Sequence, residues 1–206
     1  ILIYWGCGAE VRPGQPRIID LARGNPADFG AAFAGRYAPD RGARVGPGYV
    51  LFPNERNRVS LSRESSLVGD HQIQGDGVPP AFKFTLGPPQ DVMPAIELQS
   101  SGSPKDSIAL SWRTVSQARA YFLHAMGSVG ENDMVMWSSS EIPDSGMGLF
   151  DYLPNATIDR WIKDKVLLTP ETMQCAIPRG IFAAKEGGGG RRGDGGGMLR
   201  MIAYGS

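Results

Sequence analysis

Apolar and polar residues alternate along much of this chain, which is the pattern of β-strands with one buried face. The clearest example is the segment 107–112, in which Ile108, Leu110 and Trp112 alternate with Ala109 and Ser111. The same reading predicts strands over residues 1–5, 17–21, 49–52, 72–74, 82–86, 107–112, 118–126, 134–137 and 198–204. The run over 1–5 is interpreted as a first strand and not as a signal peptide, because no basic leader or small-residue cleavage site accompanies it.

A different period marks one helix near residues 155–166. Its apolar positions follow a spacing of three and four residues, which places them on one helical face. They are Ile158, Trp161, Ile162 and Val166. Asn155 or Thr157 is expected to cap the helix, since both side chains can accept a hydrogen bond from a free backbone amide. We expect the apolar stripe to dock on a sheet.

Turn-forming residues divide the chain. Gly and Pro contribute 28 and 16 of the 206 residues, while 41% of the chain is apolar, so many short elements around a real core are expected. Pro88 and Pro89 cannot donate to a β-ladder, and they predict a boundary between a β-rich region, 1–87, and a second domain, 92–206. Residues 187–197 include eight glycines and predict a loop between two late strands.

The order of aromatic residues in the second half suggests a known fold. A strand carrying Trp112 precedes Ser116-Gln117-Ala118-Arg119-Ala120-Tyr121, and a late strand runs over Leu199-Arg200-Met201-Ile202-Ala203-Tyr204. Residues 92–204 resemble a fibronectin type III-like β-sandwich, in which a core Trp is followed by a core Tyr. The resemblance implies a scaffold used for adhesion and binding, although a fold alone does not fix function. We therefore expect a mainly β, antiparallel, sandwich-like protein with one amphipathic helix.

Charge and hydropathy exclude two kinds of partner. Lys and Arg together number 21, and so do Asp and Glu, so the chain has no basic surplus for a phosphate backbone. Around the most apolar segment, the longest stretch free of charged residues covers only 120–130, which is too short for a membrane span. The sequence predicts no nucleic-acid partner and no membrane span.

Histidine is scarce, and this removes most catalytic and metal sites. The chain has only His71 and His124, with no spacing typical of metal ligands and no motif that pairs either one with a nucleophile. Glycine-rich segments also lack the order of a nucleotide-binding turn. We expect neither a metal ion nor an organic cofactor.

Aromatic residues lie close to acids in the second half. Trp137, Phe150 and Tyr152 accompany Glu141 and Asp144, and rings beside polar groups are typical of sugar-binding faces. Packing of the same rings in the core is the alternative.

Paired carboxylates also suit a glycosidase. The candidate acids for that activity are Glu131, Asp133, Glu141, Asp144 and Asp151.

The two cysteines, Cys7 and Cys175, leave two interpretations open. They form one disulfide, or they are separate buried thiols that pack as small apolar residues. A disulfide would favour an extracytoplasmic or secreted protein, because such bonds persist in oxidising compartments.

The function expected from these observations is a non-catalytic binding or assembly module of the cell envelope or surface. Its partner would be a protein or a glycan, bound by loops within 69–71, 129–133, 141–148 or 187–197. Two alternatives stay open: a glycan-acting hydrolase with paired carboxylates, and an intracellular β-scaffold that associates through exposed edge strands.

Overall fold

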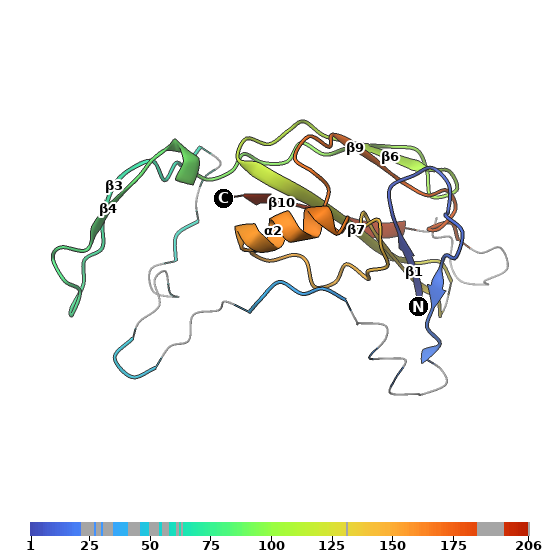
Figure 1. Ribbon diagram of the computed structural model, residues 1–206, viewed down its shortest axis with the longest axis horizontal. Helices are drawn as coiled ribbons and strands as arrows, with labels where there is room; N and C mark the ends of the chain where they lie inside the picture. Colours follow the sequence, from blue (N-terminus) through green and yellow to red (C-terminus); the bar gives the residue numbers. More distant parts are fainter. Residues whose placement is uncertain are drawn as a thin grey trace. The chain divides into compact units, whose positions relative to one another are not determined.

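The computed structural model describes residues 1–21, 27, 30, 35–40, 46–49, 54, 58–60, 62, 64–130, 132–184 and 196–205. These residues form three mostly antiparallel sheets together with the helix α2 (Asn155–Lys163) (Figure 1). The expectation of a mainly β protein with an amphipathic helix near 155–166 is therefore confirmed. Its finer part, a sandwich-like arrangement, is not confirmed.

The main sheet contains five strands. In spatial order they are β10 (Gly196–Gly205), β7 (Ala118–Ser128), β8 (Met134–Ser138), β1 (Leu2–Trp5) and β2 (Arg17–Ile18). All neighbours are antiparallel except β1 and β8, which run parallel. The first strand of the chain thus belongs to the same sheet as strands from its second half.

Two smaller sheets complete the described strands. One has the order β5 (Gln99–Ser101), β6 (Ile108–Ser111), β9 (Gln174–Ile177), with both pairs antiparallel. The other is the hairpin of β3 (Gly69–Gln72) and β4 (Lys83–Leu86), followed by the short 3₁₀ helix η2 (Pro88–Gln90) (Figure 1).

The chain divides into two compact units. Unit 1 contains residues 1–38 and 94–205, including the main sheet, the second sheet and α2. Unit 2 contains residues 39–93, including the hairpin of β3 and β4. No helix in the described part of the chain is both long and apolar enough to cross a membrane.

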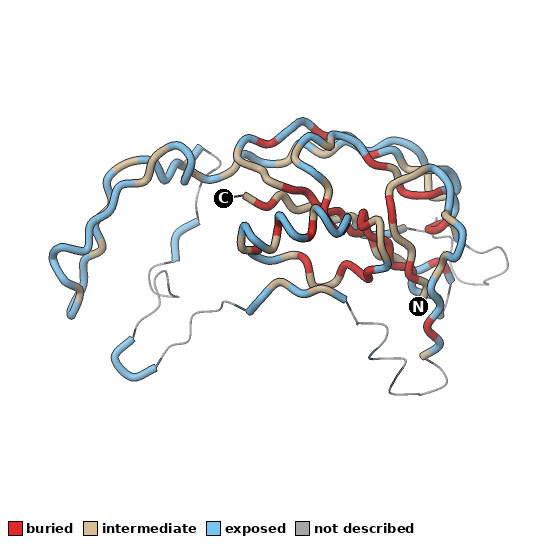
Figure 2. Tube along the Cα trace, in the orientation of Figure 1, coloured by how far each residue is buried: buried red, intermediate tan, exposed pale blue. Residues whose placement is uncertain are grey.

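Strand β7 is the centre of the core, because both of its faces are buried (Figure 2). Ala120 and Phe122 point to one face, where they pack with α2 residues in one apolar cluster. Tyr121 points to the opposite face, where its ring meets Trp112 edge to face at a centroid distance of 5.7 Å. The alternation of side chains along a strand therefore gives β7 a separate partner on each side.

Most of the predicted strands are present, with shifted ends. The predicted strand over 72–74 overlaps β3 only at Gln72, because the residues that pair with β4 are those of 69–72. Strands β5 and β9 were not predicted, since β5 is exposed along its whole length and shows no apolar alternation. Residues 50–52 and 187–195, which fall in a predicted strand and in the glycine-rich loop, lie outside the described residues.

The start of α2 differs from the expectation. Its N-cap is Pro154, whose carbonyl accepts hydrogen bonds from the amides of Thr157 and Ile158. Asn155 is the first residue of the helix, and no side chain caps it. Proline's fixed φ, −63° here, suits the end of an extended segment that leads into a helix.

Candidate functional site

Cys7 and Cys175 form a disulfide bond, with their Cα atoms 5.1 Å apart. Cys7 follows β1 of the main sheet, and Cys175 lies in β9 of the second sheet. Next to the bond, the amide of Gly8 donates to the carbonyl of Ala176 at 2.9 Å. The alternative left open by the sequence is thereby decided: the two sheets of unit 1 are joined covalently.

Arg12 and Glu141 form an ion pair next to the disulfide. Arg12 donates to both carboxylate oxygens of Glu141, at 2.6 and 3.0 Å, and to the carbonyl of Cys7 at 3.0 Å. Gly6 lies beneath the guanidinium with φ of +91°, and a Cβ there would come within 2.6 Å of Arg12 Cζ. The hydrogen bond from Arg12 lowers the pKa of Glu141, so this acid is an ionised structural partner.

Asp144 is almost completely buried, with 3% of the residue exposed. Its carboxylate accepts from Arg36 Nη1 at 3.1 Å and from the Gly146 amide at 2.8 Å. Its backbone carbonyl accepts from the hydroxyl of Ser138 at 3.0 Å. These hydrogen bonds fix the segment after β8 in place. They also leave the carboxylate of Asp144 closed to solvent.

The three aromatic candidates do not form one face. Trp137 is fully buried, its indole Nε1 donates to the Gly6 carbonyl at 3.0 Å, and its ladder partners Ala125 and Tyr4 lie on the same face of the sheet. Phe150 packs against the opposite face of the main sheet, 6.0 Å from the ring of His124. Tyr152 is 56% exposed. For Trp137, the core packing that the sequence left as an alternative is what the structure contains.

His124, on β7 of the main sheet, is a completely buried titratable group. Its Nδ1 lies 3.3 Å from Arg200 Nη2, while its Nε2 is buried with no hydrogen-bond partner in the described chain. Burial, followed by the positive charge of Arg200, lowers the pKa of His124 to about 4, and the backbone of Ser145 opposes the shift in part. Phe150 lies under the Arg200 guanidinium, 4.2 Å from it. This imidazole is neutral and inaccessible to a substrate.

The acids proposed for glycosidase chemistry are dispersed. Glu141 and Asp144 are held by arginines, and Asp151 accepts a hydrogen bond from the amide of Tyr152. Asp133 lines a shallow depression to which Glu141, Asp144 and Asp151 do not contribute. Glu131 lies outside the described residues. Among the described residues, no three His, Cys, Asp or Glu side chains come together as a metal site.

The hairpin of unit 2 carries the most distinctive exposed side chains. Side chains alternate along β3 and β4, so His71 and Phe84, which are ladder partners, share one face. Their rings stack with centroids 5.2 Å apart and planes inclined by 7°, and Phe82 meets Phe84 edge to face at 6.3 Å. We call His71, Phe82 and Phe84 the aromatic face of the hairpin.

The aromatic face is open to solvent. Phe82 is 51% exposed and Phe84 is 40% exposed, and the hairpin is drawn without buried segments in Figure 2. His71 is fixed by a hydrogen bond between its Nε2 and the carbonyl of Leu67, 2.7 Å away. Exposed rings held in fixed positions are typical of surfaces that bind a partner.

The opposite face of the hairpin is polar. Thr85 donates to Asp70 across the two strands at 2.6 Å, and Gln72 pairs with Lys83 in the ladder. A shallow depression of about 460 Å³ borders the hairpin. It is lined by Asp70, His71, Gln72, Lys83, Phe84 and Thr85. The hairpin is thus amphipathic, with aromatic and polar sides.

Sequence reasoning found the two strands of this hairpin but did not pair them. It placed Phe82, Phe84 and Leu86 on one face and singled out the loop 69–71. The additional signal was Asp76-Gly77 between the two apolar runs, because a glycine with positive φ favours a reversal of the chain. Gly77 has φ of +80° in the structure.

Comparison with known protein families, with curated proteins and with solved structures finds no match for this chain. The resemblance to fibronectin type III domains therefore remains a prediction, and function is inferred from the side chains themselves.

Proposed function

We propose that this protein is a non-catalytic binding and assembly module that works outside the cytoplasm, at the cell envelope or surface. The disulfide between Cys7 and Cys175 supports the location, because such bonds persist in oxidising compartments. A sandwich-like, fibronectin type III-like scaffold in residues 92–204 is part of the proposal. The edge-to-face contact of Trp112 with Tyr121 supports it.

The observation that carries the proposal is the exposed aromatic face of the hairpin. A two-stranded sheet is at best marginally stable by itself in water, and a third strand or a packed layer is needed to stabilise it. Within the described chain, β3 and β4 pair only with each other. The aromatic face and both strand edges are therefore suited to cover by another polypeptide.

A second copy of this chain is the occupant that we propose for the aromatic face. Lys plus Arg equals Asp plus Glu at 21 each, so two copies do not repel one another through net charge. A single apolar face can also pack on its own copy about a two-fold axis, since the same patch then serves both subunits. Two hairpins packed in this way form two layers of two strands.

The hydrolase alternative has little support from the candidate acids. Glu141 and Asp144 are bound by Arg12 and Arg36, whereas a glycosidase needs two carboxylates that face a sugar across an open cleft. A general acid also needs a pKa raised toward neutrality, and the pKa of Glu141 is lowered.

Sedimentation velocity over a wide range of protein concentrations tests the proposal. The disulfide-bonded protein is expected to form a dimer as its concentration rises, and Phe82→Ser is expected to shift that equilibrium strongly toward the monomer. Phe82→Tyr is the matched control, because it keeps an aromatic ring at the same position and should retain the dimer. Phe82 precedes β4, so neither change removes a ladder residue.

Two results would overturn the assembly proposal. One is a protein that stays monomeric at every concentration, and the other is a dimer that Phe82→Ser does not weaken. The location has a separate test in protein isolated from its native cells without reductant. We expect Cys7 and Cys175 to resist alkylation until reductant is added, whereas free labelling of both would favour the intracellular scaffold.

A further inference from the structure

Asn155-Ala156-Thr157, at the start of α2, has the form of an acceptor for N-linked glycans. Such acceptors read Asn-X-Ser/Thr, where X is any residue except proline. Of the five asparagines in the chain, only Asn155 is followed two positions later by a serine or threonine. A match of this length occurs often by chance, so the surroundings of the tripeptide decide what it does.

Helix capping is the other reason to find Asn and Thr at this place, because both residues are favoured at N-caps. The structure removes that reason. The N-cap is Pro154, and no side chain caps the helix. Within the described chain, the side chains of Asn155 and Thr157 make no hydrogen bond. The beginning of α2 therefore depends on neither side chain.

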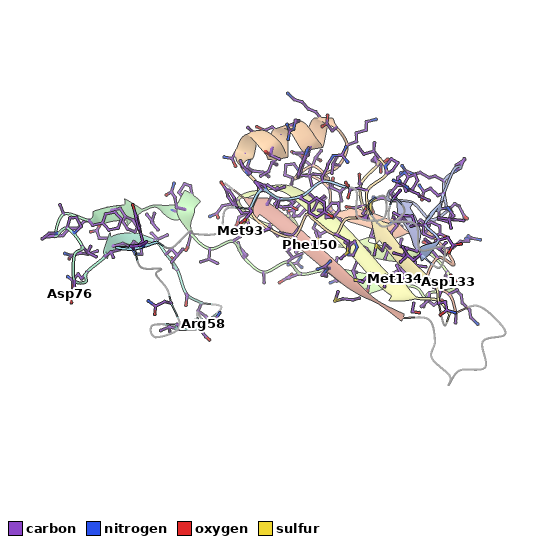
Figure 3. The ribbon with its side chains drawn as sticks, turned by 90° about the horizontal axis from the view of Figure 1, so that it is seen from below. Arg58, Asp76, Met93, Asp133, Met134 and Phe150 are labelled. Carbon is purple, nitrogen blue, oxygen red and sulfur yellow. A yellow bond between two sulfur atoms is a disulfide. The ribbon has the colours of Figure 1, made fainter. Side chains whose placement is uncertain are left out.

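Asn155 is also accessible. It is an exposed residue, while α2 contacts the main sheet through Ile158 and Trp161, which pack with Ala120 and Phe122. In Figure 3, the side chains on the other side of α2 project away from the strands. Because side chains of a helix tilt toward its N-terminus, that of the first residue points beyond the helix end and not onto the next turn. A bulky group on Asn155 would thus extend into solvent.

The disulfide and the acceptor tripeptide point to the same compartment. A bond such as that between Cys7 and Cys175 forms in oxidising surroundings, which include the lumen of the endoplasmic reticulum. N-linked glycans are added to secreted chains in that lumen, and they are found on the surface of the folded protein.

We propose that Asn155 is an N-linked glycosylation site. The site depends on the extracytoplasmic location proposed above and is independent of the dimer. The donor is an oligosaccharide linked to a polyprenyl pyrophosphate. Nδ2 of Asn155 forms a bond to C1 of the first sugar, and the bond between C1 and the pyrophosphate oxygen breaks. The pyrophosphate leaves with the electron pair, the amide loses one proton, and nothing is oxidised or reduced.

Peptide N-glycosidase treatment of the protein isolated from its native cells tests the site. In heavy-oxygen water, this enzyme releases the glycan and converts the asparagine that carried it into a heavy aspartate. Mass spectrometry of the peptides is expected to find the heavy aspartate at position 155 and at none of the other four asparagines.

Two substitutions of Thr157 form a matched pair when the variants are produced in the same cells. Thr157→Val keeps the branched shape but removes the hydroxyl that the acceptor requires, so we expect it to abolish the glycan. Thr157→Ser keeps a hydroxyl and is expected to retain the glycan. Since the Thr157 side chain makes no hydrogen bond within the described residues, both variants should fold, and the resistance of Cys7 and Cys175 to alkylation checks this.

The outcomes separate this site from the location on which it depends. An unmodified Asn155 in protein whose cysteines resist alkylation would overturn the glycosylation site and leave the location in place. Free labelling of both cysteines, with Asn155 unmodified, would overturn the two together. A glycan that persists in Thr157→Val would also overturn the site, because the modification would then not follow the acceptor tripeptide.

Discussion

Arg12 and Glu141 form a two-point ion pair across 129 positions of sequence, with distances of 2.6 and 3.0 Å. Arg12 also donates to the carbonyl of Cys7, so the pair and the disulfide hold the same turn. The main sheet, the second sheet and the segment after β8 meet at this place.

The coupling between Arg12 and Glu141 is the first prediction. Both side chains are 37% exposed, which limits the coupling to about 1 kcal/mol despite the good geometry. A double-mutant cycle with Arg12→Gln and Glu141→Gln, read by urea unfolding, measures it. The cycle is required because Arg12 also packs over Gly6, and a single substitution would include that contact.

The pH dependence of this coupling has a definite sign. The pKa of Glu141 is lowered in the fold from its ordinary value of 4.5, so the pair stabilises the protein above that pH. The contribution is lost as the pH falls through the folded pKa. Glu10→Gln is the control, because Glu10 and Arg179 form a pair whose side chains are 65% and 64% exposed. A larger effect from Glu10→Gln than from Glu141→Gln would contradict the prediction.

The disulfide is expected to contribute much more. It links residues separated by 168 positions, and constraint of so long a loop in the unfolded chain corresponds to about 5 kcal/mol in the chain-entropy model. Cys7→Ala/Cys175→Ala should lower the urea midpoint by a corresponding amount and should steepen the dependence on urea, because the unfolded chain without the bond is less compact. Equal midpoints for the variant and the oxidised protein would show that the turn around Arg12 holds unit 1 together without the bond.

Two glycines provide a matched test of packing around His124. Gly146 and Gly14 both have positive φ, +76° and +83°. A Cβ on Gly146 would come within 2.6 Å of His124 Cδ2, whereas one on Gly14 meets nothing within 4 Å. Gly14→Ala should therefore cost about 1 kcal/mol from backbone strain alone, and Gly146→Ala should cost roughly 3 kcal/mol because a clash is added. Similar thermal midpoints for the two variants would contradict this.

Local patterns in the sequence predicted the elements whose side chains have one buried face. The alternation in 107–112 predicted β6, and the three-and-four spacing of Ile158, Trp161 and Ile162 predicted α2. Strand β9 was not predicted from the sequence. It is defined by its pairing with β6, which lies far away in the chain. Its own alternation, with Cys175 and Ile177 buried, covers only four residues, which is too short to identify a strand from the sequence.

The surroundings of the candidate site residues depend on contacts between distant segments more than the strands and the helix do. Trp137 and Phe150 are close in sequence, but the two lie on opposite faces of the main sheet, because Phe150 belongs to the segment after β8 and packs over His124. In β8 itself, strand β1 is the parallel neighbour. That parallel pairing also brings Gly6 to the indole of Trp137. A strand and the acids around it could be read from the sequence, whereas the arginines that bind Glu141 and Asp144 come from a distant part of the chain.

The last prediction concerns acid sensitivity through His124. Its pKa is about 4 in the fold, below the ordinary value of 6.5, because burial and Arg200 disfavour the imidazolium ion. The unfolded chain therefore takes up a proton at a higher pH than the folded chain does. The stability linked to this group is fully present above about pH 6.5, decreases as the pH falls toward 4, and is constant below that. The whole effect amounts to roughly 3 kcal/mol.

His124→Gln removes the titration while it keeps an uncharged polar side chain beside Arg200. Between about pH 7 and pH 5 the original protein should lose roughly 2 kcal/mol more than this variant, measured by urea unfolding at each pH. The ring-proton NMR signals of His124 give an independent reading, since their midpoint should lie near pH 4. A midpoint near 6.5, together with parallel pH profiles for the two proteins, would mean that Phe150 and Arg200 open readily and admit water to the imidazole. In that case the buried Nε2 has a solvent partner, and the segment after β8 is a less rigid cover than its hydrogen bonds to Asp144 indicate.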